Sequence, residues 1–318
     1  NYPDLAPPHH LLLQHSLSQI EIDSTLAIFL NLQASHRNTA SQWAIARLLE
    51  LKKNRLLAIS YYHEAIRLSS KEVPFGLIRD YVRFLRSDSN ESAWLEIDRK
   101  FDENDANRYI AYAHRNLLDG EFRRGLENLN ESEKRQKLSP GELLLKATFI
   151  RYLNQHAEAR ELLIQALRQA QTNHDQHLEA LILLDLSIVY KNLDRKEMAW
   201  ETIDKVEQMV LTRFESIVAQ RFWGTKAILS RAYGDLERAE SQYEKALKIA
   251  LKIGEFHDAV RWYTGLGNVQ FHDNDFNSAL KNFKAGEQKA MKQRNIYRQI
   301  ELMLNKADLY SHLRQAIA

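Results

Sequence analysis

The chain has 318 residues, of which 44 are basic and 42 acidic, and its formal net charge is +2. A net charge this small does not by itself indicate nucleic-acid binding. The sequence contains no cysteine, which excludes disulfide bonds, thiolate nucleophiles and cysteine-ligated zinc or iron–sulfur sites.

Proline and glycine are scarce. The chain has 5 prolines and 10 glycines, where average usage would give about 15 and about 22. Beyond the first eight residues only Pro74 and Pro140 remain, and such a chain is hard to turn often enough for an all-β protein. Because 44% hydrophobic and 27% charged residues are typical of an ordered globular chain, the composition predicts an all-α fold.

The same composition bears on location. No apolar run approaches the roughly 18 residues that cross a bilayer, so we expect no membrane partner. The absence of cysteine leaves the compartment open; a reducing cytosol is the default, and we expect a cytoplasmic protein. The first residue is Asn1 rather than Met, and we expect a fragment of a larger protein.

Along the chain, three segments are expected. They are a linker or tail at 1–10, N-terminal capping helices at 11–37, and a helical repeat array at 38–318 that is most regular over 140–318. The first repeat unit is indicated by Ala58-x3-Tyr62-x2-Ala65, with Ala46 in the preceding helix. This spacing places small and large apolar residues on one helical face.

The next two units are weaker. Segment 77–97 is a degenerate copy, in which Tyr81 occupies a position that other units fill with a small residue. The following unit is centred on Gly125. Pro74 and Pro140 each fall at the first position of an expected helix, where the missing N–H costs nothing. Pro140 also lies within a Ser-Pro-Gly-Glu capping box.

From residue 140 onward the repeat has a fixed period of 40 residues. Second helices carry an alanine at this interval, and a small residue lies 12 positions upstream of each: Ala159, Ala199, Ala239 and Ala279, preceded by Ala147, Ser187, Ala227 and Gly267. A fixed period with helical spacing indicates two antiparallel helices per unit, each unit packing on its neighbours. We predict turns near residues 54, 120, 154, 194, 234 and 274 and burial of the small residues.

The last expected helix, residues 296–316, has no second-helix partner. Its polar face is compatible with a cap exposed to solvent: Asn305, Lys306, Asp308, Ser311 and Arg314. The alternative is that the chain is cut at this point.

These units resemble the tetratricopeptide repeat. The best copy is Tyr263-x2-Leu-Gly, with Asn274-Asp-Phe at the turn and Ala279-x3-Phe283 in the second helix. The 40-residue period looks like that of bacterial signal-sensing regulators, polarity adaptors and kinesin light chains. The resemblance implies an α–α superhelix of about seven helical hairpins, whose concave surface binds a peptide, a partner helix or a small effector.

Motifs of enzymes are absent from the sequence. It contains neither a Gly-rich phosphate loop nor a Gly-x-Ser-x-Gly elbow. The closest metal-like spacing, His174-x2-His177, lacks a third and a fourth ligand. We therefore expect no catalytic activity, no metal and no cofactor.

Basic residues recur at one position of the first helices. Arg151, Lys191 and Arg231 occupy it in three consecutive units, with Phe271 in the fourth. Aligned cations repel one another modestly, which suggests an anionic ligand; the alternative is ordinary solvated surface. The candidate groove-binding residues, taken together with neighbouring positions, are Arg151, Lys191, Arg231, Arg221, Arg261, Asn268 and Phe271.

Two functions of different kinds remain open. The first is a non-catalytic scaffold whose groove binds a protein or peptide segment, acidic in character, as part of a larger protein. The second is a sensor domain of a multidomain signalling or transcription regulator. Direct nucleic-acid binding is disfavoured by the small net charge. The oligomeric state stays open.

Overall fold

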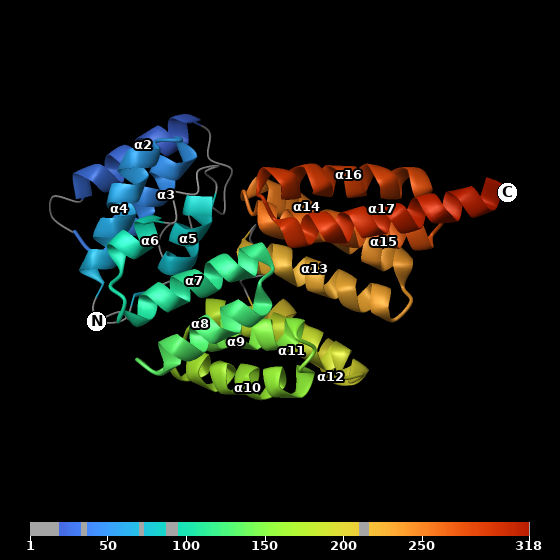
Figure 1. Cartoon of the computed structure of the whole chain (residues 1–318), viewed down its shortest axis with the longest axis horizontal. Helices are drawn as coiled ribbons and strands as arrows, with labels where there is room; N and C mark the ends of the chain where they lie inside the picture. The colour runs from blue at the N-terminus through green and yellow to red at the C-terminus, as the bar shows by residue number, and fades with distance from the viewer. Residues whose placement is uncertain (1–18, 33–36, 70–72, 87–94, 210–215, 318) are drawn as a thin grey trace.

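The structure, a computed structural model, describes residues 19–32, 37–69, 73–86, 95–209 and 216–317. Every regular element within these ranges is an α-helix (Figure 1), which confirms the all-α prediction. The helices are α2 (Gln19–Leu32), α3 (Thr39–Leu51), α4 (Arg55–Leu68), α5 (Phe75–Arg86), α6 (Leu95–Lys100), α7 (Ala106–Asp119), α8 (Phe122–Glu133), α9 (Pro140–Tyr152), α10 (His156–Thr172), α11 (Gln176–Asn192), α12 (Lys196–Gln208), α13 (Ile217–Ala232), α14 (Leu236–Lys252), α15 (Phe256–His272), α16 (Phe276–Lys292) and α17 (Ile296–Ile317).

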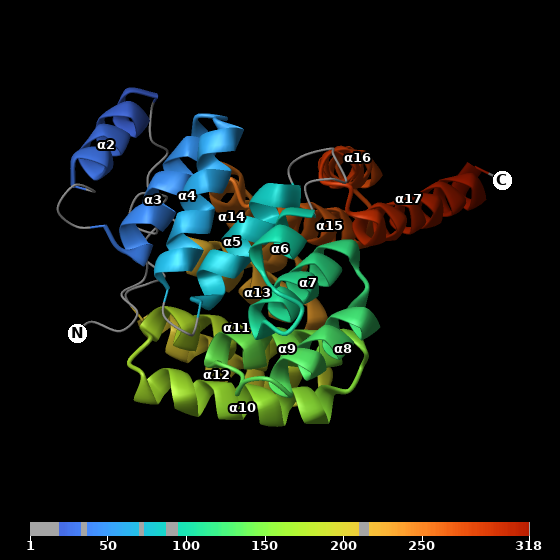
Figure 2. The ribbon, with the colours of Figure 1, turned by 60° about the vertical axis from the view of Figure 1, so that its left-hand side comes forward.

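Consecutive helices pack in pairs, as the repeat predicts. Six regular hairpins are α3/α4, α7/α8, α9/α10, α11/α12, α13/α14 and α15/α16, and the short α6 after α5 takes the place of a seventh. The final helix, α17, packs against α16 and α15. Each hairpin also contacts the next one, so the chain forms a curved solenoid (Figures 1 and 2).

The 40-residue period has a simple structural origin. Helices α10, α11, α14, α15 and α16 each contain 17 residues. Three-residue connections join them, as in 173–175 and 273–275. Two helices and two connections therefore make one unit of 40 residues, longer than the usual repeat because its helices are longer.

The short connections between the regular helices each turn through one residue with a left-handed backbone. In the regular array these residues are 20 positions apart, or 40 across the undescribed residues 210–215: Asn154, His174, Asp194, Gly234, Gly254, Asn274 and Arg294. The amide of the residue that follows donates to the carbonyl five positions earlier, as from Gln155 to Ile150 at 3.1 Å. This is the Schellman ending of a helix, which favours glycine and asparagine. The predicted turns at 54, 120, 154, 194, 234 and 274 are confirmed.

The small residues of the ladder lie at helix crossings and are buried, as predicted. Ala227 and Ala239 face each other across the α13/α14 hairpin and are fully buried. At the equivalent crossing of α15 and α16, a Cβ added to Gly267 would lie 2.5 Å from the ring of Phe283. A larger side chain would therefore force the two helices apart.

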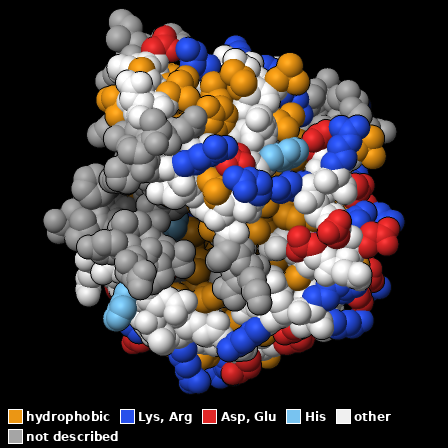
Figure 3. Space-filling view, turned by 90° about the vertical axis from the view of Figure 1, so that its left-hand side faces the viewer, with side chains coloured by type: hydrophobic (Ala, Val, Ile, Leu, Met, Phe, Trp, Pro, Cys, Tyr) orange, Lys and Arg blue, Asp and Glu red, His pale blue; other side chains and the backbone are white. Residues whose placement is uncertain are grey.

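The N-terminal part departs from the regular pattern. Of the capping segment 11–37 the structure describes α2 and residue 37. The expected tail at 1–10 lies outside the described residues. Pro140 begins α9 inside the predicted capping box, but Pro74 lies one residue before α5 rather than within it. Figure 3 shows this end of the molecule, with hydrophobic side chains on its surface. The exposed apolar side chains of α2 and α4 include Ile28 and Leu56.

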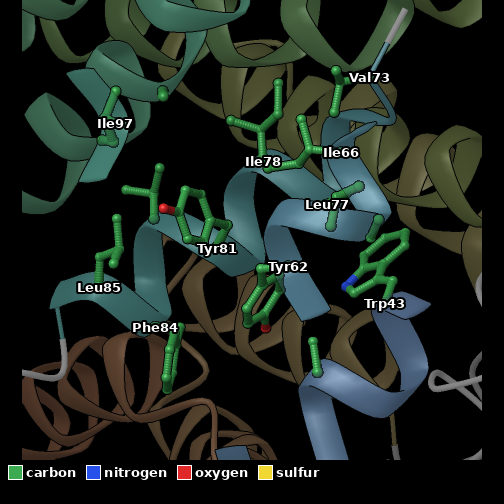
Figure 4. Close-up of a cluster of buried hydrophobic side chains, with 14 of the residues drawn as sticks. Trp43, Tyr62, Ile66, Val73, Leu77, Ile78, Tyr81, Phe84, Leu85 and Ile97 are labelled. Atoms are coloured by element: carbon green, nitrogen blue, oxygen red, sulfur yellow. The ribbon is translucent and has the colours of Figure 1, made fainter. Parts of the chain in front are cut away.

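The degenerate unit at 77–97 is explained by its aromatic core. Tyr81 is fully buried beside Tyr62, with ring centroids 5.4 Å apart (Figure 4). Its hydroxyl lies 2.7 Å from Nε2 of His63. Phe84 also packs against Tyr62, with ring centroids 5.5 Å apart. Because three rings fill this space, α5 cannot approach its neighbours as closely as the alanine-bearing helices do.

The last helix exposes apolar as well as polar side chains: Asp308, Ser311 and Arg314 are exposed, as expected of a solvent-facing cap. Ile300, Met303 and Leu304 are all more than half exposed, and they form one stripe along α17 with the exposed Ala307. Lys306, which was expected on the solvent face, instead pairs with Glu287 of α16. The stripe is equivalent to the surface of α15 that packs on α16, so α17 exposes an apolar face that the sequence analysis did not expect.

Candidate functional site

An open pocket of about 630 Å³ is formed by the ends of α9 and α11 and the beginnings of α10 and α17. The residues that line it are Arg151, Tyr152, Asn154, His156, Lys191, Asn192 and Tyr297. Because α9 and α17 come from opposite ends of the regular array, the pocket lies inside the curve of the solenoid.

Two arginines share a single buried carboxylate beside this pocket. Asp185 of α11 accepts a hydrogen bond from Arg221 at 2.9 Å and pairs with Arg151 at 3.5 Å. The side chain of Arg151 is only 9% exposed, and its Nε has no hydrogen-bond partner. Asp258 also acts on Arg221, whereas Arg151 has only its contact with Asp185, so Arg151 keeps an unpaired Nε donor at the pocket.

Three further cations, Lys191, Arg231 and Arg261, form no ion pair with a described carboxylate. Burial lowers the pKa of Lys191, and neighbouring arginines, Arg231 first among them, lower it further. Burial also lowers the pKa of Arg261, with contributions from Arg151 and other cations. Lysine and arginine lose protons more readily where the surrounding potential is positive. The inner face therefore carries a surplus of positive charge.

Tyr152 lies at the centre of an aromatic and cationic cluster. Its ring stacks on Phe122, with centroids 4.3 Å apart, and meets the edge of Tyr297 at 6.4 Å. Arg298 donates to its hydroxyl at 3.3 Å, and Arg151 lies over its ring at 4.6 Å. Burial alone would raise the pKa of Tyr152, but the surrounding arginines, Arg298 foremost, lower it to about 8.

A second charged cluster, between α3, α5 and the connection before α15, is balanced by comparison. Its members are Arg47, Arg79, Arg83, Glu50, Asp80 and Glu255. All three arginines contact Asp80 at 3.2 to 3.8 Å, and the two glutamates pair with Arg47 and Arg83. Three cations face three carboxylates, so this cluster holds helices together and leaves no charge for a ligand.

The structure brings together some of the predicted site residues and separates others. Arg151 and Lys191 line the pocket. The charges of Arg231 and Arg261 act on Lys191, and Arg221 pairs with Asp185. Asn268 and Phe271 lie further along α15 and are not among the lining residues. Phe271 packs instead on His312 of α17 and on Phe276, with centroids 5.7 and 5.9 Å away.

The aromatic residues of the pocket were missed by the sequence analysis. Tyr152 could have been found from its place directly after Arg151 at the end of a first helix. Tyr297 carries no such signal, because it reaches the pocket from a helix about 140 residues later in the chain. Within the described residues, no group of three or more histidine or acidic side chains could hold a metal ion. None of the described helices is long and apolar enough to cross a membrane.

No protein-family model matches the chain, and no curated protein sequence matches it significantly. Solved structures do. NprR in complex with its cognate peptide NprX has 13% sequence identity and a TM-score of 0.61, covering 93% of this chain and 88% of that one. A Rap protein complexed with competence and sporulation factor has 12% identity and a TM-score of 0.56, covering 90% and 80%.

A third similar structure is the anaphase-promoting complex hetero-tetramer Cut9–Hcn1, with 11% identity and a TM-score of 0.57. The match covers 92% of this chain but only 56% of that one. The fold is a tetratricopeptide-type helical solenoid. At these identities the shared property is the tetratricopeptide architecture itself: stacked helical hairpins with first helices on the inner face.

Proposed function

We propose that the chain is a non-catalytic scaffold that binds an acidic peptide or protein segment on the inner face of its tetratricopeptide-type solenoid. The observation that carries this proposal is the surplus of cations that form no ion pair with a described carboxylate, Lys191 and Arg231 above all, at equivalent positions of successive units. An extended chain with several carboxylates can contact successive repeats, whereas a compact ligand cannot.

Two of the similar structures agree with this proposal. The NprR structure contains a cognate peptide, and the Rap structure contains competence and sporulation factor. Both have TM-scores above 0.5 over at least 90% of this chain. A solenoid of this architecture is therefore able to bind a ligand of that kind.

A second candidate is a small anionic effector, which would suit a sensor domain of a larger regulator. The observation that favours it is the compactness of the pocket, about 630 Å³ bounded by both ends of the array. The two candidates differ in which cations matter. A peptide would need Arg231, outside the pocket lining, whereas a small effector would need only Arg151 and Lys191.

The test is selection of displayed random peptides on the purified protein, followed by affinity measurement at two salt concentrations. We expect the selected peptides to be rich in aspartate and glutamate. The double variant Lys191→Glu with Arg231→Glu should lose at least about tenfold in affinity, or about 1.4 kcal/mol. Its thermal stability should fall only by the loss of the hydrogen bond between Arg231 and Tyr243, because neither residue forms an ion pair with a described carboxylate.

The matched control reverses two exposed lysines on second helices, Lys205→Glu with Lys248→Glu. It changes the net charge by the same amount at a distance from the inner face. Equal loss in both double variants would mean that only overall charge attracts the peptides. Equal retention in both would contradict a binding role for the inner face.

A further inference from the structure

The two ends of the solenoid touch across its interior. Helix α5 meets the connections that precede α15 and α17, and α9 and the start of α8 meet the first turn of α17. Figure 2 shows α5–α7 beside the C-terminal helices. Arg83 of α5 pairs with Glu255 in one of these connections. The contacting residues are more than 140 positions apart in the sequence, so the array closes on itself.

Arg86 forms the most direct of these contacts. Its Nε donates to the carbonyl of Gln293 at 3.1 Å and its Nη2 to the carbonyl of Arg294 at 2.6 Å. Both carbonyls lie just beyond the end of α16, where the helix dipole favours a cation. Asp119 at the end of α7 pairs with the same guanidinium, so one arginine joins α5, α7 and α16.

Tyr297 forms the second contact. A Cβ added to Gly120, which has a left-handed backbone, would lie 2.4 Å from the Cβ of Tyr297. The ring of Tyr297 meets the edge of Phe122 with centroids 5.2 Å apart. The same side chain is one wall of the inner pocket, so the pocket has this wall only when the solenoid is closed.

Among the described residues, no hydrophobic core is shared by the two ends that meet at the closure. The buried cluster of the N-terminal helices extends to Phe149 of α9, and the cluster of the C-terminal helices begins at Val260 of α15. No hydrophobic cluster of described residues includes members of both. The ends can therefore separate without exposing a core, at the cost of polar contacts and one group of aromatic rings.

Closure also has an electrostatic cost. It places Arg298 of α17 beside Tyr152, where Arg151 is already present. Glu301 pairs with Arg298, but Arg151 shares its one carboxylate with Arg221. Like charges that are brought together in a partly buried site repel strongly unless an anion lies between them. A bound anion would therefore favour the closed arrangement.

We infer that the pocket between α9, α11 and α17 is a composite binding site for an oxyanion, a carboxylate or phosphate group, and that its occupancy holds the solenoid closed. This inference rests on the proposed function, because the oxyanion would belong to the ligand of the inner face. Binding and closure are then one coupled equilibrium, in which the ligand is bound more tightly by the closed form that carries the Tyr297 wall.

The experiment measures the distance between the two ends directly. Because the chain has no cysteine, Arg123→Cys in α8 and Lys292→Cys at the end of α16 accept two spin labels without further changes; both side chains are exposed. Distance distributions are recorded in inorganic phosphate, in acetate, and in sodium chloride of the same ionic strength. The anion that acts shows whether the ligand group is a phosphate or a carboxylate.

We expect at least one oxyanion to lower the long-distance population about threefold or more relative to chloride. Tyr297→Ala should raise that population without ligand and weaken oxyanion binding, while Tyr297→Phe, which keeps the ring, should behave like the parent. Arg151→Gln should lose the oxyanion effect. Identical distributions in all three salts, or unchanged oxyanion binding in Tyr297→Ala, would overturn the inference.

The result of the distance measurement can be distinguished from the result of peptide selection. Acidic peptides that bind without changing the distance would refute the closure and leave the proposed function in place. Oxyanions that close the solenoid when no peptide is selected would support the composite site and refute the peptide scaffold.

Discussion

Tyr152 shows how strongly one residue can be affected by the charges around it. Its phenol is packed between Phe122 and the guanidinium of Arg151 and accepts a hydrogen bond from Arg298. Burial disfavours the phenolate and cations favour it; here the cations prevail and lower the pKa to about 8. The residue is therefore a reporter of the positive potential inside the solenoid.

The first prediction concerns the pH dependence of stability. The pKa of Tyr152 is about 8 in the folded chain against an ordinary value of 10.0. Between these values the folded state has lost a proton that the unfolded state keeps, so stability rises with pH. Relative to Tyr152→Phe, the parent should gain up to about 2–3 kcal/mol in free energy of unfolding from pH 8 to 10, with no gain below pH 8.

Denaturant titrations at several pH values measure this difference, and the ultraviolet absorbance of tyrosinate locates the ionisation. The same proton loss adds a negative charge beside Arg151, so oxyanion affinity should fall above pH 8 in the parent and less in Tyr152→Phe. A parent and a variant with parallel stability curves would show that the arginines do not act on this phenol.

At the scale of the elements, packing in a repeat depends on which helix lies next to a position. Ala227 and Ala307 occupy the same repeat position in α13 and α17, 80 residues apart. Ala227 is fully buried against α14, whereas Ala307 is exposed because no described helix covers that face of α17. The same residue type thus has two different structural roles.

The second prediction compares leucine at these two positions. Ala227→Leu should overpack the α13/α14 crossing and lower the free energy of unfolding by about 1–3 kcal/mol. Ala307→Leu should change it by less than about 0.5 kcal/mol, because the new side chain projects from an exposed face. Chemical denaturation of both variants checks this. Equal costs at the two positions would show that the repeat frame is misplaced.

Most of the helical hairpins could be predicted from the sequence. Each hairpin packs on its immediate neighbours, and the spacing of small and large apolar residues along the chain indicates this packing. The ladder through Ala147 and Ala159 placed the hairpins and their buried positions correctly. The left-handed turns at His174 and Arg294 carry no glycine or asparagine, so residue type gave no sign of them. Their places follow only from the 20-residue spacing of the other turns.

For the molecule as a whole, the curve of the solenoid decides which distant residues meet. The small rotation from one hairpin to the next accumulates along the array and is not encoded in any single period. The alignment of Arg151 and Lys191 on one side of the array could be predicted, because those residues occupy the same position in neighbouring units. Tyr297 and Gly120 could not be paired from the sequence, since their contact exists only after the array has completed its curve.

The third prediction uses two glycines with similar backbones. Gly120 and Gly234 both have positive φ, 78° and 89°, so alanine at either should cost about 1 kcal/mol in backbone strain. Only at Gly120 would the new Cβ meet Tyr297; at Gly234 it would meet nothing within 4 Å. Gly120→Ala should therefore also separate the two ends.

Small-angle X-ray scattering should give a larger radius of gyration for Gly120→Ala than for Gly234→Ala, which should match the parent. The free energy of unfolding should also fall further in Gly120→Ala. Indistinguishable scattering from the two variants would mean that Tyr297 can move aside without opening the solenoid.

The contact of Arg86 with the end of α16 also limits how this chain can change in length. In an open array an extra hairpin, 40 residues spliced between two left-handed turns, would extend the molecule and leave every existing neighbour in place. Here an added unit would carry Gln293 and Arg294 past the guanidinium that binds them, and a deleted unit would leave them short of it. Duplication and loss of hairpins, the common route by which repeat proteins diversify, would therefore be selected against for as long as closure matters to the protein.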